Sequence, residues 1–518
     1  MPGYWLARSC VCGPIQDANP DTMTHCSSSS LWRNGLALAL AAVLAAPALA
    51  QAPLLQAATP LAAEAAGPAP TAPSSPSAPT ASATPAAANQ LPAAAADAPP
   101  PSPDAQQAYM AARDKLVQIR TLRRQTNTQS STGSGFFVSE DGLLITNYHV
   151  VSQLALEPER HRAVLVSVSG QEAPVQLLAI DVLHDLALLR VAPAKDSSAG
   201  AEGATERHYS ALPLRPSSRP LSGGERIFSL GNPLDVGFAI TEGTYNGLVQ
   251  RSFYPRIFFG GTLNPGMSGG PAIDTQGRVV GVNVAKQLGA EQLSFLVPVE
   301  FVEQLLAQGR EASPVKGAMH AEVTRQLMAH QKDLVDRVLS GSSRTERYGP
   351  YRVPVPSETL ARCWGDGRER RSESLFDFER SQCRIDSEVF TGDGDVGGLG
   401  MRYEAYDAPR LSPWQFAHTY GASFANEPMR KRGNRVRTGY ECREDFVAGD
   451  AKLPLRAVVC MAAYRKFSGL YDLTVLAVSV DQPRQGVLGR LNVSAVSFDN
   501  AQRLARQYLQ GFSSEAAQ

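Results

Sequence analysis

The sequence predicts a β-rich domain over residues 126–310 and a smaller α+β domain over residues 346–514. In the first segment, short apolar runs between turn residues predict strands at 136–138, 143–146, 186–191 and 278–284. In the second segment, runs rich in β-branched residues predict strands at 473–480 and 491–498, and a helix is expected to follow from Asp499. Four of the seven cysteines lie in this second segment.

The composition is balanced in charge. The chain has 518 residues, with 49 Lys and Arg against 49 Asp and Glu, so its formal net charge is +0. A protein that binds nucleic acid through bulk charge carries a basic excess, so we expect no nucleic-acid partner. Hydrophobic residues make up 43% of the chain, which is enough for globular cores.

Residues 31–50 have the pattern of a secretory signal. Arg33 is followed by an uninterrupted apolar run over Gly35–Ala46 and then by Ala48-Leu49-Ala50, a small-x-small cleavage pattern. The run is shorter than the about 20 residues that a membrane span requires, which favours a cleaved signal peptide over an uncleaved anchor. We therefore expect residues 1–50 to be a signal region, with the true start at Met23. The mature protein should be periplasmic or secreted and have no stable membrane span.

Three further segments have compositions of their own. Residues 51–103 are almost wholly Ala, Pro, Ser and Thr, a composition that cannot offset chain entropy by burial and predicts a disordered linker. Residues 104–125 carry apolar residues near helical spacing, which predicts a helix ahead of the first domain. Residues 311–345 contain a second helical stretch and are expected to form a helical connector.

His149 and Asp185 stand at the ends of predicted strands. His149 follows the strand at 143–146, and Asp185 directly precedes the apolar strand at 186–191. A carboxylate in that place can stay at the edge of a core and still reach a neighbouring side chain. Asp181 and His184 are rival candidates nearby, and Asp185 is preferred because it adjoins the strand.

Ser268 lies in a glycine-rich turn with the sequence NPGMSGGP. Glycine permits the dihedral angles and the close approach that an exposed nucleophile needs. The N–H groups of Gly266 and Ser268 can converge on one point, which predicts an oxyanion hole. A serine needs a base, imidazole can take and return the proton, and an aspartate fixes the imidazole. His149, Asp185 and Ser268 are thus predicted to form a catalytic triad.

The same turn also matches the Gly-x-Ser-x-Gly elbow of α/β hydrolases. That fold requires a helix directly after the serine and a histidine late in the chain. Here Pro271 and a β-type run follow the serine, and His149 precedes it. An esterase of that class is therefore disfavoured.

Together these motifs resemble the trypsin-like serine peptidases of the HtrA (Deg) group. The resemblance extends over about residues 113–310, and its matching stretches are TNYHVV around His149, DLALLRV from Asp185, GNP at 231–233, ITEG at 240–243, GMSGGP around Ser268, GVN at 281–283 and SFLVP ending at Pro298. It implies an all-β fold of two six-stranded β-barrels of the chymotrypsin/trypsin type, with the active site between them. It also implies hydrolysis of protein or peptide substrates without a metal or an organic cofactor.

Two features depart from that group. Met267 stands where relatives usually have Asn or Asp, and its side chain cannot make their polar contacts. The ordering of the turn therefore does not follow from the resemblance. No PDZ domain is evident after Pro298, so the substrate recruitment and cage assembly typical of the group are not assumed, and homo-oligomerisation is left open.

By analogy with the group, Thr262, Val282, Asn283, Val284 and Phe295 are expected to border the substrate pocket. Thr262 lies six positions before the serine, where trypsin-like enzymes place the base of the pocket. It is not acidic, so a strong preference for Lys or Arg is not expected. A small or medium apolar side chain before the cleaved bond is expected instead.

The four cysteines of the second domain predict two disulfides. Four cysteines allow three pairings, and we favour Cys363 with Cys383 and Cys442 with Cys460. The alternative is four buried free thiols.

The leading functional hypothesis is an exported serine endopeptidase. The alternative is a binding or scaffold module of the cell envelope, built on a peptidase fold with little turnover. Met267 favours this alternative, and the complete triad weighs against it. The sequence assigns no function to the second domain.

Overall fold

The computed structural model describes residues 102–193, 208–284, 294–341, 344–367, 375–425, 433–449 and 453–515. These residues all belong to one compact unit, Ala94–Gln518. The predicted signal region, and all of the predicted linker except its last two residues, lie outside the described residues.

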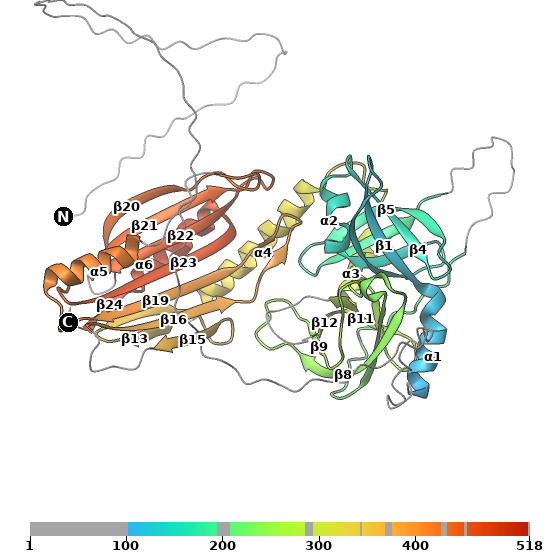
Figure 1. Ribbon diagram of the computed structural model, residues 1–518, viewed down its shortest axis with the longest axis horizontal. Helices are drawn as coiled ribbons and strands as arrows, with labels where there is room; N and C mark the ends of the chain where they lie inside the picture. The colour runs from blue at the N-terminus through green and yellow to red at the C-terminus, as the bar shows by residue number, and fades with distance from the viewer. Residues whose placement is uncertain are drawn as a thin grey trace, which may run out of the picture. The chain divides into compact units, whose positions relative to one another are not determined.

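The first structural domain begins with a closed antiparallel barrel, drawn in blue to cyan in Figure 1. Its strands pair in the order β1-β2-β3-β6-β5-β4. They are β1 (Leu116–Arg123), β2 (Gln129–Phe137), β3 (Leu143–Asn147), β4 (His161–Ser167), β5 (Glu172–Asp181) and β6 (Leu186–Val191). Helix α2 (Tyr148–Leu156) follows β3 directly. Buried apolar side chains of the strands, such as Ile119 and Leu189, pack with side chains of α2 to form the core of this barrel.

A second closed antiparallel barrel follows, with the strand order β10-β11-β12-β9-β8-β7. Its strands are β7 (Arg226–Gly231), β8 (Ala239–Leu248), β9 (Ile257–Phe259), β10 (Pro271–Ile273), β11 (Val279–Val284) and β12 (Ser294–Pro298), and the short helix η2 (Pro233–Asp235) precedes β8. One apolar cluster joins Leu188 of the first barrel, Phe228 of the second and Val302 of helix α3 (Val299–Gly309). The predicted double β-barrel is confirmed.

The helix predicted over residues 104–125 is wrong in its second half. Helix α1 spans Pro103–Ala112, and a single 3-10 turn, η1 (Arg113–Lys115), leads into β1. β1 pairs with β2 on one side and with β4 on the other, which places Ile119 in the core at 0% exposure. Strand pairing on both sides and β-branched side chains outweigh a weak helical spacing. The barrel therefore begins ahead of the predicted boundary at residue 126.

The second domain is built on a seven-stranded antiparallel sheet with the order β15-β16-β19-β23-β22-β21-β20. Its strands are β15 (Arg362–Gly367), β16 (Asp377–Ile385), β19 (Leu399–Asp407), β20 (Glu441–Ala448), β21 (Pro454–Ala463), β22 (Leu470–Ser479) and β23 (Gln485–Ser497). The strands predicted at 473–480 and 491–498 correspond to β22 and β23. The favoured cysteine pairing is present, and each disulfide ties an edge strand to its neighbour: Cys363–Cys383 joins β15 to β16, and Cys442–Cys460 joins β20 to β21.

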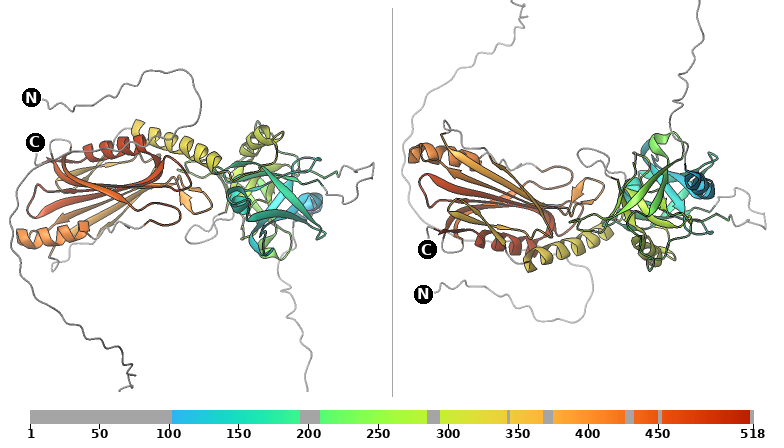
Figure 2. Two further views of the ribbon diagram at one scale, coloured as in Figure 1. Left: turned by 90° about the horizontal axis from the view of Figure 1, so that it is seen from above. Right: turned by 90° about the horizontal axis from the view of Figure 1, so that it is seen from below.

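Helices cover both faces of this sheet, as Figure 2 shows. Along β22, Val475 packs with helix α6 (Phe498–Gln510) on one face, whereas Leu476 packs with helix α5 (Pro413–Ala425) on the other. This alternation follows the two-residue period of a strand. The N-cap of α6 is Ser497 and not Asp499, so the helix begins two residues earlier than expected.

Helix α4 (His320–Ser340) takes part in two cores. Its first half contributes Val323 and Leu327 to the cluster of the first barrel, and its second half contributes Leu334 and Val335 to the cluster under the large sheet. The predicted connector is thus a helix that packs into both domains.

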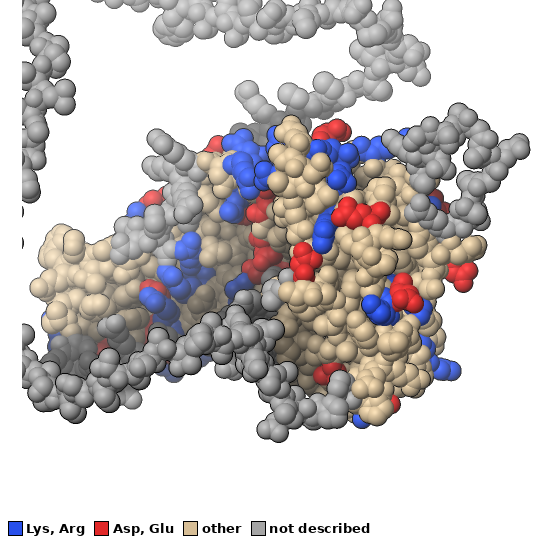
Figure 3. Space-filling view, turned by 45° about the vertical axis from the view of Figure 1, so that its right-hand side comes forward, with Lys and Arg blue, Asp and Glu red and all other residues tan. Residues whose placement is uncertain are grey.

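Two smaller sheets complete the described fold. One has the strands β13 (Arg344–Tyr348), β14 (Tyr351–Val355) and β24 (Ser513–Ser514), and the other is a hairpin of β17 (Val389–Phe390) and β18 (Asp395–Val396). On the face shown in Figure 3, basic and acidic side chains lie next to one another, in keeping with the zero net charge.

Candidate active site

The strand register of the first barrel brings His149 and Asp185 together. β3 pairs with β6, and Asn147 lies opposite Leu186. His149 follows Asn147 by two residues, in the first turn of α2, and Asp185 directly precedes Leu186. The two side chains therefore meet at one end of paired strands.

Asp185 contacts His149 through both carboxylate oxygens. Oδ2 lies 2.6 Å from His149 Nδ1, and Oδ1 accepts the backbone N–H of His149 at 2.9 Å. The backbone oxygen of Asp185 accepts two further bonds, from the N–H of Tyr148 at 3.0 Å and from Nδ2 of Asn147 at 2.8 Å. Asp185 adopts a φ of +56°, a left-handed conformation that Asp tolerates better than most residues. With Nδ1 bound to the carboxylate, Nε2 is the ring nitrogen that faces away from Asp185.

The rival candidates Asp181 and His184 form a separate pair. Asp181 Oδ2 lies 2.6 Å from His184 Nδ1, and Asp181 Oδ1 accepts the N–H of His184 at 3.1 Å. The His184 ring stacks on Phe301, with 3.6 Å between the ring centroids. The structure thus brings Asp185, and not Asp181, to His149.

The turn that carries Ser268 packs against the first barrel. The backbone oxygen of Ser268 accepts the N–H of Ser134 at 2.7 Å, and Ser268 is 4% exposed. A Cβ on Gly269 would clash with the backbone oxygen of Ser134 and lie 2.9 Å from the backbone nitrogen of Asn147, two residues before His149. Gly266 and Gly269 have φ values of +96° and +84°, which glycine adopts without strain. The turn therefore lies against the chain segment that leads into His149.

The side chain of Met267 is buried next to Ser268. It is 1% exposed, and a Cβ on Gly231 would lie 2.8 Å from its Cα. Its carbonyl accepts the N–H of Gly270 at 3.0 Å and Nδ2 of Asn283 at 3.3 Å. The turn is thus held by packing and by hydrogen bonds that its backbone oxygens accept, without a polar side chain at position 267.

The predicted pocket residues separate into two groups. Val282 and Asn283 are both 0% exposed: Val282 belongs to the apolar cluster that joins the two barrels, and the Asn283 amide bonds to the Ser229 hydroxyl and to the backbone oxygen of Leu230. Their place at the substrate pocket stays a prediction. Thr262 and Val284 are partly buried, and Phe295, at 7% exposure, lies opposite Val284 across β11 and β12. Residues 285–293, between β11 and β12, lie outside the described residues.

Sequence reasoning missed one aromatic neighbour of His149. The ring of Phe390, on β17 of the second domain, lies 6.5 Å from the imidazole at an interplanar angle of 90°. Phe390 also contacts Tyr148, whose pKa is raised by burial and further by the nearby carboxylates of Asp185 and Asp393. Phe390 lies far from His149 in the sequence, and no motif marks it, so only the tertiary structure reveals the contact.

No group of three or more His, Cys, Asp or Glu side chains within the described ranges is arranged to hold a metal ion. Among those same residues, no helix is both long and apolar enough to cross a membrane.

Residues 133–282 match the family model of the trypsin-like peptidase domain. The chain is 31% identical over 216 residues to a putative serine protease HhoB of Synechocystis sp., covering 38% of this chain and 47% of that protein. It is 30% identical over 216 residues to a probable periplasmic serine endoprotease DegP-like of Hahella chejuensis, covering 40% and 42% of the two chains. It is 31% identical over 210 residues to serine protease HTR4 of Rattus norvegicus, covering 38% of each chain.

The chain spans less than half the length of these curated relatives. Among solved structures, a serine endoprotease from Yersinia pestis matches with a TM-score of 0.32 at 22% identity, covering 41% of this chain and 67% of that chain. The family match and the two closed barrels together show that the chain contains a trypsin-like peptidase domain.

Proposed function

We propose that this chain is an exported serine endopeptidase that cleaves peptide bonds in protein substrates through His149, Asp185 and Ser268. The contact between Asp185 and both the imidazole and the backbone of His149 is the observation that carries the proposal. The turn of Ser268 supports it, because that turn packs against the same end of the first barrel.

In the proposed mechanism, Ser268 Oγ attacks the scissile carbonyl carbon while His149 Nε2 takes the hydroxyl proton. The C–N bond then breaks, and the same nitrogen of His149 gives the proton to the leaving amine. A water molecule hydrolyses the acyl-enzyme by the same route, with His149 again as the base. Asp185 keeps Nδ1 protonated and stabilises the imidazolium that forms. The N–H groups of Gly266 and Ser268 are the proposed donors to the oxyanion.

The proposed location is the periplasm or the exterior of the cell. The apolar run before Ala50 supports it, as do relatives whose names describe periplasmic endoproteases.

For the substrate, we propose a small or medium apolar side chain before the cleaved bond. Thr262, Val284 and Phe295 would border the pocket that receives it.

The direct test is labelling of the purified chain with a fluorophosphonate, which reacts only with an activated serine. We expect one adduct, located by peptide mapping at Ser268 and absent from Ser268→Ala. A matched control is Ser130→Ala, which alters a serine of β2 whose hydroxyl donates to the backbone oxygen of Thr121. This control should be labelled like the wild type.

Absence of an adduct on the folded wild-type protein would contradict the proposal. It would favour the alternative of a catalytically weak binding or scaffold module. If the adduct forms, cleavage of peptides with alanine, valine or arginine before the scissile bond then tests the pocket. Preference for arginine would contradict the proposed specificity.

A further inference from the structure

The β17–β18 hairpin of the second domain docks on the helix that carries His149. The hairpin side chains Val389 and Val396 are 2% and 5% exposed and belong to the same apolar cluster as Val150 and Leu156 of α2. Gly392, at the hairpin tip, has a φ of +94°, and a Cβ at this position would lie 2.6 Å from Leu156 Cδ1. A side chain at this position would require Leu156 to move and would hold a backbone conformation that glycine adopts without strain.

The tip closes on itself and presents Phe390 to the active site. Both the N–H and the hydroxyl of Thr391 donate to the backbone oxygen of Gly394, at 3.0 and 2.9 Å. Tyr148 donates its hydroxyl to the backbone oxygen of Thr391 at 3.5 Å. The Phe390 ring is thereby held perpendicular to the imidazole of His149, in the edge-to-face arrangement that aromatic rings favour.

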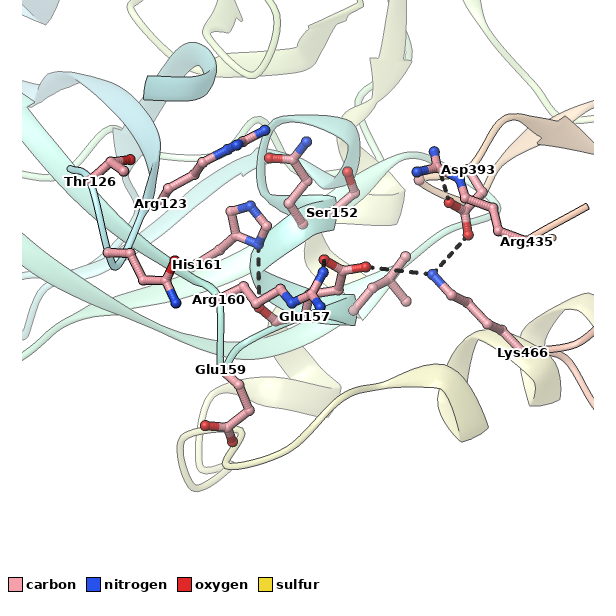
Figure 4. A pocket seen from close by; sticks show the side chains of 14 residues that line it. Arg123, Thr126, Ser152, Glu157, Glu159, Arg160, His161, Asp393, Arg435 and Lys466 are labelled. Atoms are coloured by element: carbon pink, nitrogen blue, oxygen red, sulfur yellow. Dashed lines mark hydrogen bonds and ion pairs between the residues drawn. The ribbon is translucent and has the colours of Figure 1, made fainter. Parts of the chain in front are cut away.

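A group of charged side chains surrounds Asp393 of the same hairpin, as Figure 4 shows. Lys466 Nζ lies 3.0 Å from Asp393 at the hairpin tip and 3.6 Å from Glu157 at the end of α2. Arg435 lies 3.7 Å from Asp393, and Arg160 lies 3.8 Å from Glu157. These residues line a cavity of ≈ 500 Å³ that water and salt can enter, so the ion pairs are open to screening. We call the contacts among Glu157, Asp393 and Lys466 the ionic latch.

We propose that Phe390 is a positioning residue for His149, and that the second domain, docked through the hairpin and the ionic latch, holds the imidazole in its reactive orientation. The inference rests on the serine-peptidase function proposed above. Asp185 holds the imidazole at Nδ1, and a tilt of the ring about that bond would displace Nε2. An aromatic ring at right angles to the imidazole restricts this tilt. The peptidase domain thus depends on a contact that its own sequence does not supply.

The test measures the second-order rate constant for fluorophosphonate labelling of Ser268 in the full chain. We expect Phe390→Ala to react at least about tenfold more slowly, which corresponds to about 1.4 kcal/mol of barrier. Phe390→Tyr retains the ring and should react within about threefold of the wild type. Lys466→Ala should slow labelling several-fold, and high salt should slow the wild type more than this variant.

A spectroscopic readout separates positioning from loss of fold. The His149 Nδ1 proton bonded to Asp185 should give a far-downfield ¹H resonance that broadens in Phe390→Ala and persists in Phe390→Tyr. Trp414→Ala, in the same domain, alters an 87% exposed residue of α5 and should change neither readout. Circular dichroism and thermal unfolding confirm that each variant is folded.

The outcomes are distinguishable. If the wild type is labelled and folded Phe390→Ala reacts at the same rate, the inference about Phe390 is overturned and the proposed function stands. If the wild type is not labelled, the proposed function fails, and the His149 resonance still decides whether Phe390 holds the ring. An unchanged resonance in Phe390→Ala overturns the inference in that case.

Discussion

Asp185 accepts two hydrogen bonds from His149, one from its backbone N–H at 2.9 Å and one at the imidazole Nδ1 over 2.6 Å. A single carboxylate thus fixes both the start of α2 and the direction of the ring. The strained φ of +56° at Asp185 is held by the bonds that its backbone oxygen accepts from Tyr148 and Asn147. Several contacts that act on one residue can hold its backbone in an unfavourable conformation.

Asp185→Asn should lower peptidase turnover by about 10³–10⁴-fold, because an amide cannot stabilise the imidazolium and favours the wrong tautomer. Thermal stability should change little, since Asn also tolerates a left-handed backbone. The measurement is kcat on a peptide substrate together with the melting temperature. Asp181→Asn, which alters the carboxylate of the separate His184 pair, is the matched control and should retain most turnover. A greater loss from Asp181→Asn than from Asp185→Asn would reverse the assignment.

Met267→Ala should reduce both stability and reactivity. Met267 is 1% exposed, and truncation of a buried Met costs about 2–5 kcal/mol of unfolding free energy. The cavity would loosen the turn of Ser268, so fluorophosphonate labelling should slow in parallel. Urea unfolding and the labelling rate measure the two effects. Met110→Ala removes the same side chain at a position that is 71% exposed and should be neutral. Equal behaviour of the two variants would show that Met267 does not order the turn.

Reduction of the two disulfides should destabilise the second domain. Cys363 and Cys383 are separated by 20 residues, and Cys442 and Cys460 by 18. Loop-closure entropy assigns about 3 kcal/mol to each crosslink of this size. Unfolding followed by tryptophan fluorescence, with and without a reducing agent, measures the change. Peptide mapping after alkylation of the unfolded, unreduced chain should find none of the four thiols modified. Modification of all four would show that they are free.

Acid should weaken the contact between the domains through His330. Burial lowers the pKa of His330, whose Nδ1 lies 2.7 Å from the Tyr254 hydroxyl and whose Nε2 lies 3.1 Å from the backbone oxygen of Gly397. The unfolded chain binds a proton at this histidine below about pH 6.5, while the folded chain does so only at lower pH. The stability that the neutral His330 contributes is therefore fully present above that pH and is lost as the pH drops below it. The nearby Asp333 carboxylate only partly offsets the effect of burial.

Urea unfolding at several pH values between neutral and mildly acidic measures this dependence. His330→Gln should be less stable at neutral pH but should lose less stability on acidification. His320, whose pKa is also lowered by burial, should retain a smaller slope in the same direction. Equal slopes in the wild type and the variant would show that His330 does not carry the effect.

Much of the fold could be predicted because strand patterns are local. The apolar run at 186–191 and the β-branched runs of β22 and β23 predict strands that the structure contains, since each has the two-residue or buried pattern of a strand. The sequence of Leu116–Arg123 predicts a helix instead, because its spacing is ambiguous over a few residues. Only pairing with β2 and β4, which come later in the chain, makes it a strand.

The types of chemical group and their order along the chain can be read from the sequence alone: a histidine and an aspartate at strand ends, a serine in a glycine-rich turn and four cysteines in the second domain. Each of these signals consists of residues that are close together in the sequence, so no tertiary contact is needed to recognise it. Three features follow only from the folded chain: which carboxylate meets His149, which of the expected pocket residues are buried, and that Phe390 lies beside the imidazole. Those contacts join segments that are distant in the sequence, and they depend on how the barrels, α4 and the second domain pack.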